Sequence, residues 1–300
     1  MNIGVTGGSG FIGSRIVDQL AKLGHDVLSI DMVEPAQRSN FSFAKADLTS
    51  FEDTQKLVQG LDTVYHVAGT VLDQVRADPY RASEININIT RNVAEASRKR
   101  NVKKIIFASS FYVYDGLPPQ MIVNEATPLN TLDMELFGGT KVFGETLLKE
   151  YARKYGIKYV ILRFGSAYGP GGQGSNVIKN FLDSALAGKT IEVWGPGRRK
   201  NQYTFVDDLA KGSVASLSRD NEIYNLISPE ETTVKQLTEI VSRKLPAMVQ
   251  FALDKKEGSS MPYMSSRKAI AELNWAPITV DKGIDRILGR QTEQLLATTN

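Results

Sequence analysis

The amino-acid sequence predicts a doubly wound α/β fold, in which helices cover both faces of a parallel sheet. Short and nearly continuous apolar runs recur along the first half of the chain, as they do in strands that are buried on both faces. Patterns with a helical period separate these runs, and the alternation is typical of a parallel sheet. The apolar runs occupy residues 3–6, 27–31, 63–69, 105–109 and 159–164.

The helices between these strands carry signals of their own. The first is predicted by an apolar stripe with a 3.6-residue period, which faces the sheet. This stripe consists of Ile12, Ile16, Leu20 and Leu23. Ser50, with Asp53 three residues later, has the form of a capping box and predicts the start of another helix. Two further helices are expected around residues 79–100 and 138–155.

The texture of the sequence changes near residue 170. Residues 169–174 have the composition of a loop. The helical patterns that follow, at residues 177–186 and 234–244, are short and are separated by strand-like pieces. We therefore expect a first domain over residues 1–170 and a smaller α/β lobe over residues 171–300, with some later segments returning to the first domain.

Composition and charge exclude several classes of protein. The 36 Lys and Arg against 33 Asp and Glu leave a net charge of +3, which provides no extended basic field for a nucleic acid. The chain has no cysteine, and therefore no disulfide or thiolate metal site. Its two histidines, His25 and His66, leave little material for a catalytic triad or a metal centre. Since no apolar run reaches the roughly 18 residues that span a bilayer, and the N-terminus lacks the pattern of an export signal, we expect a cytoplasmic protein that binds no metal, membrane or nucleic acid.

A glycine-rich turn follows the first predicted strand. Gly7, Gly10 and Gly13 have the spacing G-x-x-G-x-x-G, and the amphipathic helix comes directly after them. Such a turn lets the backbone approach a pyrophosphate, which the N-terminus of the helix attracts. The strand before and the helix after are the context that a dinucleotide site requires. Asp31, at the end of the second strand, favours NAD over NADP because its carboxylate accepts from ribose hydroxyls and repels a 2′-phosphate; the alternative is an aspartate that makes only a local turn.

With these motifs the chain resembles the extended short-chain dehydrogenase/reductases of the nucleotide-sugar epimerase and dehydratase group, over essentially its whole length. The resemblance is carried by residues 6–13, Asp47-Leu48, residues 64–69, Asn86 and residues 109–114. It implies NAD as cofactor in the first domain, a nucleotide-diphosphate sugar, with UDP favoured, in the second lobe, and a structural role for His66. The cofactor contacts that it implies are Gly7, Gly10, Phe11, Ile12, Gly13, Asp31, Asp47, Leu48, Ala68, Lys141 and Phe164. Relatives pair through the two long helices near residues 79–100 and 138–155, so the resemblance also implies a homodimer.

The chain departs from the family pattern at its hallmark. The family carries Tyr-x-x-x-Lys, with the two side chains one helical turn apart, but here Phe137 stands at the tyrosine position and Lys141 retains the lysine. In relatives the tyrosine oxygen removes a proton from the sugar hydroxyl as hydride leaves for NAD. Because Phe137 cannot do so, the chain is either a member without turnover, whether natural or engineered, or an enzyme with a replacement base.

Three side chains are candidates for that base. The pKa of Lys141 can fall by up to about 3 to 5 units from its ordinary value near 10.4 when the amine is desolvated. Tyr112 matches the position at which retaining 4,6-dehydratases carry an acidic residue over the sugar ring, although packing under the cofactor loop would also explain it. Glu135 lies in an acidic segment about two residues longer than in relatives, and a solvated first helical turn is its alternative. Ser110 matches the catalytic Ser or Thr of the family and is expected to bind the C4 oxygen.

Loss of the tyrosine with retention of the lysine also occurs in inverting sugar-nucleotide dehydratases of the family. The segment resembles UDP-N-acetylglucosamine 5,6-dehydratases of antibiotic biosynthesis, with the tunicamycin pathway as the nearest match. Oxidation at C4 acidifies the C5 proton, so that the C6 hydroxyl can leave as water before the hydride returns. The preferred prediction is therefore an NAD-retaining dehydratase that acts on a UDP-hexosamine. A 4-epimerase and an NAD-binding sensor or scaffold without turnover are the alternatives.

The second lobe carries the substrate contacts that the resemblance implies. Residues 163–170 resemble the family's Arg-x-x-Asn-x-Tyr-Gly-Pro, with Ser166 in place of the asparagine. Residues 191–195 resemble the strand that clasps a uracil or thymine ring. The usual diphosphate arginine falls at Asn201, and Arg199 can replace it, although a basic run is more often a solvated face. The implied contacts are Thr70, Ser166, Asn176, Val193, Trp194, Arg199, Asn201 and Tyr203.

Overall fold

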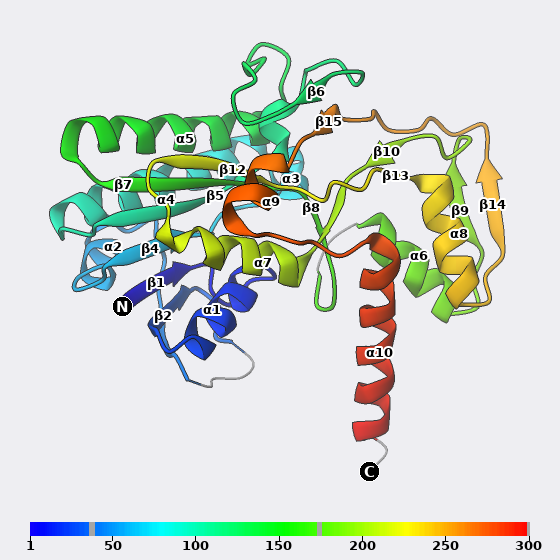
Figure 1. Cartoon of the computed structure of the whole chain (residues 1–300), viewed down its shortest axis with the longest axis horizontal. Helices are drawn as coiled ribbons and strands as arrows, with labels where there is room; N and C mark the ends of the chain where they lie inside the picture. The colour runs from blue at the N-terminus through cyan, green and yellow to red at the C-terminus, as the bar shows by residue number, and fades with distance from the viewer. Residues whose placement is uncertain (36–39, 173–175, 299–300) are drawn as a thin grey trace.

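A seven-stranded parallel sheet forms the centre of the molecule (Figure 1). The computed structural model describes residues 1–35, 40–172 and 176–298, with only the backbone of residues 290–298. The strand order is β12-β7-β5-β4-β1-β2-β3, and it reverses between β1 and β4, as in the predicted doubly wound fold. The strands are β1 (Asn2–Thr6), β2 (Asp26–Asp31), β3 (Ser42–Lys45), β4 (Thr63–His66), β5 (Lys104–Ser110), β7 (Lys158–Phe164) and β12 (Glu222–Leu226).

Helices cover both faces of this sheet, because successive side chains of a strand point to opposite faces. Tyr65 of β4 packs toward α1, α7 and α9, whereas its neighbour Val64 packs toward α2 and α4. In Figure 1, α5 lies along one side of the sheet and α1 and α7 along the other. The bounds are α1 (Gly13–Lys22), α7 (Val206–Ala215) and α9 (Arg267–Leu273), and opposite them α2 (Phe51–Leu57), α4 (Pro79–Lys99) and α5 (Leu136–Tyr155).

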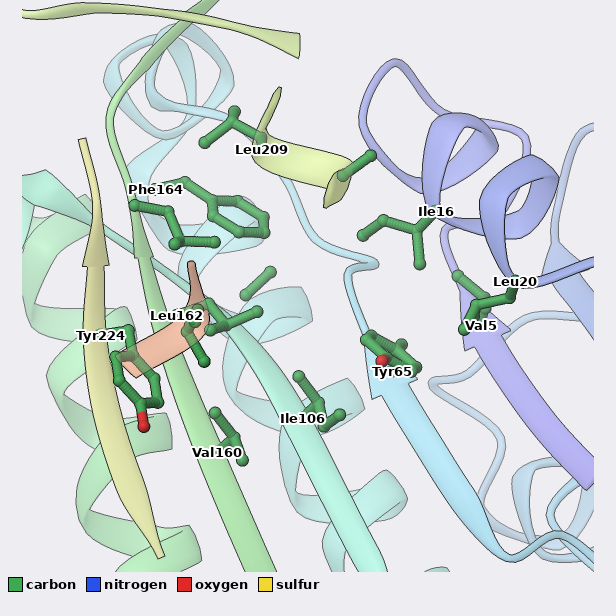
Figure 2. Packing of buried hydrophobic residues seen from close by; sticks show 14 of the residues in the cluster. Val5, Ile16, Leu20, Tyr65, Ile106, Val160, Leu162, Phe164, Leu209 and Tyr224 are labelled. Carbon is green, nitrogen blue, oxygen red and sulfur yellow. The ribbon is translucent and has the colours of Figure 1, made fainter. Parts of the chain in front are cut away.

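Three residues of the predicted apolar stripe, Ile12, Ile16 and Leu20, pack on the largest core cluster. The prediction for Leu23 is wrong, because α1 ends at Lys22 and the side chain of Leu23 is 63% exposed. Ile16 and Leu20 are fully buried against Val5 and Tyr65, as Figure 2 shows. Burial of one such aliphatic side chain stabilises the fold by about 1.5 to 3 kcal/mol. Ser50 caps α2 as predicted, since its side chain accepts a hydrogen bond from the backbone N–H of Asp53 at 3.4 Å.

Several predicted bounds need correction. The strand predicted over residues 63–69 ends at His66, after which the chain leaves the sheet toward the candidate site. The helix predicted from residue 138 begins at Leu136. β3 and β12 were not predicted, because β3 has only four residues at the edge of the sheet and β12 enters from the second half of the chain. Of the predicted loop over residues 169–174, the last two lie outside the described residues.

The second lobe packs around its own apolar cluster, which includes Phe181, Ile191, Leu237 and Ile284. Figure 1 shows it at one end of the sheet, with α10 extending from it toward the C-terminus. Its elements are β8 (Ser166–Tyr168), α6 (Val177–Leu186), β9 (Ile191–Trp194), β10 (Lys200–Asn201), β11 (Tyr203–Phe205), β13 (Thr232–Thr233), α8 (Val234–Lys244), β14 (Val249–Ala252) and α10 (Val280–Thr298). The remaining short elements are α3 (Leu72–Ala77), η1 (Phe111–Tyr114), β6 (Ile122–Val123), η2 (Ser216–Ser218) and β15 (Tyr263–Met264). Across the described ranges, every helix is too short or too polar to cross a bilayer.

Candidate active site

The glycine turn between β1 and α1 has no room for a side chain at Gly7 or Gly13. Gly7 has a left-handed backbone with φ of +69°, and a Cβ there would lie 2.8 Å from the backbone nitrogen of Ala68. A Cβ on Gly13 would lie 2.0 Å from the carbonyl oxygen of Gly7. The turn is closed by a hydrogen bond of 3.0 Å from the N–H of Gly10 to the same oxygen. The hydroxyl of Ser9 is buried in the turn without a partner among the described residues. This bare backbone cradle at a helix N-terminus fits a pyrophosphate.

Asp31 lies beside this turn at the end of β2. Its carboxylate accepts hydrogen bonds from the backbone N–H groups of Ser9 at 3.0 Å and of Val33 at 3.1 Å. Asp31 therefore makes the local turn that the sequence analysis gave as the alternative to ribose binding. An ionised carboxylate has about four acceptor positions, so these two bonds leave acceptor capacity for the two ribose hydroxyls of an adenosine.

The predicted adenine-flanking residues lie at the same edge of the sheet. Asp47 lines a cavity of about 410 Å³ together with Met32 and Lys45, and its Oδ1 accepts from the N–H and hydroxyl of Thr49. Leu48 is buried and packs on the side of the sheet that α2 and α4 cover. On the other side of the glycine turn, the ring of Phe11 faces Gly172, where a Cβ would lie 3.4 Å from it, and Ile12 packs on the main core.

Lys141 lies near the N-terminus of α5 and is partly buried. Its Nζ donates a hydrogen bond of 2.9 Å to the carbonyl oxygen of Ala108 and lies 5.3 Å from the ring centre of Phe107 and 5.8 Å from that of Phe137. Burial lowers the pKa of Lys141 to about 8. At a pH near 8 the nitrogen is therefore about half deprotonated, and at pH 7 about one-tenth of it is, so that it can accept a proton.

His66 has a structural role, as expected. Its two ring nitrogens lie 2.9 Å from the hydroxyl of Thr6 and 3.1 Å from that of Thr90. Burial, followed by the charge of Lys141, lowers the pKa of His66 to about 3. The ring is therefore neutral at physiological pH and is occupied by its two threonine partners.

Ser110, Thr70 and Asn86 connect the segments around Lys141. Ser110 ends β5, where its hydroxyl accepts from the N–H of Tyr112 at 3.2 Å and caps η1, and it pairs in register with Phe164 of β7. Asn86 of α4 accepts at Oδ1 from the N–H of Thr70 at 2.7 Å. Its Nδ2 also donates to the hydroxyl of Thr140, at 3.4 Å, next to Lys141. The structure thus brings the segments after β4 and β5 to the start of α5.

The position of the family tyrosine is filled by packing. Phe137 is 9% exposed and contacts a small apolar cluster with Val75 and Ala82. The ring of Tyr112 meets it edge to face, with centroids 5.7 Å apart. Burial raises the pKa of Tyr112, and four charged side chains act on its hydroxyl from nearby. These are Arg76 and Arg199, which lower the pKa, and Glu135 and Asp115, which raise it.

Glu135 is held by an arginine that the sequence did not single out. Arg76 of α3 donates from Nε to Oε2 at 2.9 Å and from Nη2 to Oε1 at 2.6 Å, and both side chains are about half exposed. The hydrogen bonds and the charge of Glu135 raise the pKa of Arg76. Glu135 is therefore an anchored anion rather than the freely solvated group of the alternative. Nothing in the sequence around Arg76 marks it, because its partner lies 59 residues away.

The second lobe contributes a further group of predicted residues. Ser166 of β8 pairs in register with Tyr203 of β11, and Asn176 donates to the carbonyl oxygen of Ala167 while it caps α6. The hydroxyl of Tyr203 is buried. Burial raises the pKa of Tyr203, whereas Arg199, through its charge, and the polar groups of Asn201 and Arg199 beside the hydroxyl lower it. Arg199 is partly buried, and its charge lowers the pKa of both Tyr112 and Tyr203.

Two predicted contacts in this lobe need qualification. The side chain of Val193 is 1% exposed and belongs to the core of the lobe, so the contact predicted for this residue would fall to its backbone and stays a prediction. Trp194, the next residue, is 57% exposed, and its Nε1 donates to Glu192. The side chain of Asn201 accepts from the N–H of Gln202.

Across the described residues, no group of three His, Cys, Asp or Glu side chains could hold a metal ion.

Known proteins share this architecture. The chain matches the family described as "NAD dependent epimerase/dehydratase family" over residues 3–226. A candidate UDP-glucose 4-epimerase of Methanocaldococcus jannaschii is 33% identical over 298 residues, which cover 95% of this chain and 96% of that protein. The structure of a UDP-glucose 4-epimerase of Thermotoga maritima with UDP-glucose has a TM-score of 0.87 and 26% identity, over 98% of this chain and 100% of that one. A UDP-glucuronic acid 4-epimerase of Bacillus cereus, in complex with UDP-glucuronic acid and NAD, has a TM-score of 0.84 and 26% identity, over 96% and 98% of the two chains.

Proposed function

Since this chain belongs to the NAD dependent epimerase/dehydratase family, we propose that it is an NAD-dependent nucleotide-sugar dehydratase, with a UDP-hexosamine such as UDP-N-acetylglucosamine as substrate. Bound NAD supplies the hydride acceptor for oxidation at C4 and, once reduced, the hydride donor that completes the cycle. The bare glycine turn at Gly7 and Gly13 would hold its pyrophosphate, and Asp31 its adenosine ribose. Lys141, Ser110 and Phe164 would lie at its nicotinamide half.

The observation that carries the proposal is the replacement of the phenol by Phe137 beside a lysine that can accept a proton. The hydroxyl of Ser110 binds the C4 oxygen, and Lys141, whose pKa is lowered to about 8, takes the C4 hydroxyl proton as the C4 hydride departs. The C4–O bond thereby becomes a ketone, which acidifies the proton at C5. Elimination of water then needs further proton-transfer groups, one at C5 and one at C6.

Glu135 and Tyr112 are the groups proposed for these two proton transfers. The carboxylate of Glu135 takes the C5 proton, and the electron pair left at C5 forms the C5–C6 double bond as the C6–O bond breaks. The neutral phenol of Tyr112, whose pKa is raised by burial, gives its proton to the departing hydroxide, so that water leaves. Arg76 and Arg199 stabilise the resulting phenolate, and proton transfer from Glu135 to Tyr112 restores both groups. Lys141 returns its proton to the sugar when the hydride returns, to the C4 oxygen for a hydride delivered to C4 and to C5 for a hydride delivered to C6.

A 4-epimerase is the second candidate, because the relatives described above carry that activity in their names. In an epimerase the hydride returns to the opposite face of C4 and no bond at C6 breaks. The anchored Glu135 and the half-buried Tyr112 then have no proton to move. A protein that binds NAD without turnover is the remaining alternative.

A homodimer is part of the proposal. The outer faces of α4 and α5 leave Phe143, Leu147 and Tyr151 partly exposed around a cavity of about 540 Å³. These are the two helices through which the resemblance implies pairing, and burial of their apolar side chains against a second copy would stabilise the pair.

Mass spectrometry of the purified protein with UDP-N-acetylglucosamine and a panel of other nucleotide sugars tests the reaction. Loss of the mass of one water supports dehydration, a new isomer of unchanged mass supports epimerisation, and recovery of every substrate unchanged supports binding without turnover. Glu135→Gln should slow dehydration by about 10²-fold or more. Asp133→Asn is the matched control, because Asp133 lies in the same segment but accepts from Asn130 rather than from Arg76, and it should retain the rate of the unmodified protein.

A further inference from the structure

A buried polar cluster lies behind the candidate site. Glu145 of α5 and Arg163 of β7 form a bidentate ion pair, with 2.9 Å from Nε to Oε1 and 2.8 Å from Nη2 to Oε2, and their side chains are 2% and 3% exposed. Burial opposes the charge of Arg163, but the hydrogen bond to Glu145 and the charge of Glu145 outweigh it and raise the pKa of Arg163. The guanidinium is therefore charged in the folded protein.

Hydrogen bonds extend this pair to three other elements. The hydroxyl of Ser109, at the end of β5, donates to Oε1 of Glu145 at 2.7 Å. Arg163 donates from Nη1 to the hydroxyl of Tyr114 in η1 at 2.7 Å, and Tyr114 in turn donates to Oδ1 of Asn225 in β12 at 2.9 Å. These five residues, Ser109, Tyr114, Glu145, Arg163 and Asn225, are called the Arg163 cluster below.

Four members of the Arg163 cluster lie within one to four residues of a candidate site residue in the sequence. Ser109 precedes Ser110, and Arg163 precedes Phe164, so in each strand the neighbouring side chains point to opposite faces. Tyr114 lies two residues after Tyr112 in η1. Glu145 lies one helical turn after Lys141, on the same side of α5. The cluster thus joins the elements that carry the proton-transfer groups while its own side chains remain buried.

A stable core alone does not require such a cluster. Removal of two charges from water is costly, and replacement of a buried ion pair by apolar side chains of similar volume is often neutral or stabilising. What the guanidinium fork adds is a fixed geometry, because each of its N–H groups points in a set direction. Here the guanidinium of Arg163 in β7 binds Glu145 of α5 and Tyr114 of η1 directly, and Ser109 at the end of β5 through Glu145.

We infer that Glu145 and Arg163 are positioning residues, whose ion pair holds Ser110 and Tyr112 in the orientation that Lys141 requires. This inference rests on the proposed site, but it does not depend on whether the reaction is dehydration or epimerisation. None of the five side chains is expected to touch substrate.

A double replacement, Glu145→Leu with Arg163→Met, separates positioning from stability. Single replacement of either residue leaves its partner as an unpaired buried charge and should lower the unfolding midpoint, whereas the double replacement should recover most of that loss. If the cluster positions the site, the recovered double variant should still lose at least about 10-fold in kcat, with little change in KM, and at least about 5-fold in NAD affinity. Recovery of kcat and NAD affinity together with stability would overturn the inference.

Two further variants complete the test. Tyr114→Phe removes one hydroxyl from the cluster but leaves the ion pair intact. Because Arg163 and Asn225 each lose a buried hydrogen-bond partner, it should lower the unfolding midpoint less than either single charge replacement does, and it should reduce kcat by about 3- to 10-fold when kcat is measured well below that midpoint. Glu150→Gln with Arg153→Gln removes an exposed ion pair from the same helix and should change none of these quantities. NAD affinity is measured without any sugar. If no nucleotide sugar is turned over, the proposed function fails, and unchanged NAD affinity in the double variant would still overturn the positioning role.

Discussion

The two ends of the candidate site are built from different materials. At the cofactor end, the backbone forms the surface, since the glycine turn between β1 and α1 excludes any side chain at Gly7 and Gly13. At the sugar end, side chains from α3, η1 and the start of α5 form the surface, namely Arg76, Tyr112 and Glu135. A backbone surface admits few substitutions, whereas a side-chain surface can exchange one proton-transfer group for another.

Lys141 lies where the two ends meet. Its nitrogen binds the backbone of β5, and its neighbour one turn earlier is Phe137 of the apolar packing beside Tyr112. The lysine is retained and the tyrosine is not. Under the proposed function, Lys141 is constrained by the cofactor end, while the position of Phe137 at the sugar end is free to vary with the reaction.

The largest effect is expected from Gly13→Ala at the cofactor end. Its Cβ would lie 2.0 Å from the carbonyl oxygen of Gly7, so the turn must open and lose its fit to a pyrophosphate. NAD affinity, measured by calorimetry, should fall by at least about 100-fold. Gly289→Ala is the control, since a Cβ there meets open space, and it should leave NAD affinity unchanged and stabilise the fold by about 0.5 to 1 kcal/mol. Unchanged NAD affinity in Gly13→Ala would remove the contrast between the two ends.

An intermediate effect is expected at the boundary from Lys141→Met, which retains the length of the side chain without the amine. The rate of oxidation at C4 should fall by about 10²- to 10⁴-fold. In the unmodified protein this rate should rise with pH and level off above the pKa of Lys141, about 8, because only the deprotonated amine accepts the proton. Single-turnover measurements of NADH absorbance across this range check both points. A flat pH profile would exclude Lys141 as the proton acceptor.

The smallest effect is expected at the sugar end from Phe137→Tyr. If proton transfer has passed to Lys141, Tyr112 and Glu135, restoration of the family phenol should change the dehydration rate by less than about 5-fold, which corresponds to under about 1 kcal/mol in the barrier. Phe137→Leu controls for the loss of edge-to-face packing with Tyr112. Mass spectrometry of the products gives the result. A large gain in the dehydration rate would mean that no other group has replaced the phenol, and a change of product to an isomer of unchanged mass would mean that the chain is an epimerase that has lost its base.

Local patterns were sufficient to predict five of the seven strands of the sheet and most of the helices. The apolar runs corresponding to β1, β2, β5 and β7 and the capped start of α2 follow from burial on two faces and from hydrogen-bonding rules within a few residues. β12 was not predicted, because its five residues are fixed as a strand by pairing with β7, which lies about 60 residues earlier in the chain. The burial of the Val193 side chain also escapes a local pattern, because its strand faces a core assembled from α6, α8 and α10.

The amino-acid sequence alone determined the fold class, the position of the glycine turn and the absence of a phenol at Phe137, because each depends on the identity of residues close together in the chain. The tertiary structure decided the charge state and environment of the site. Burial against Phe107 and Ala108 lowers the pKa of Lys141, and Arg76 reaches Glu135 across 59 residues. Such effects arise from distances between segments that only packing brings together, and for that reason they are absent from any local pattern.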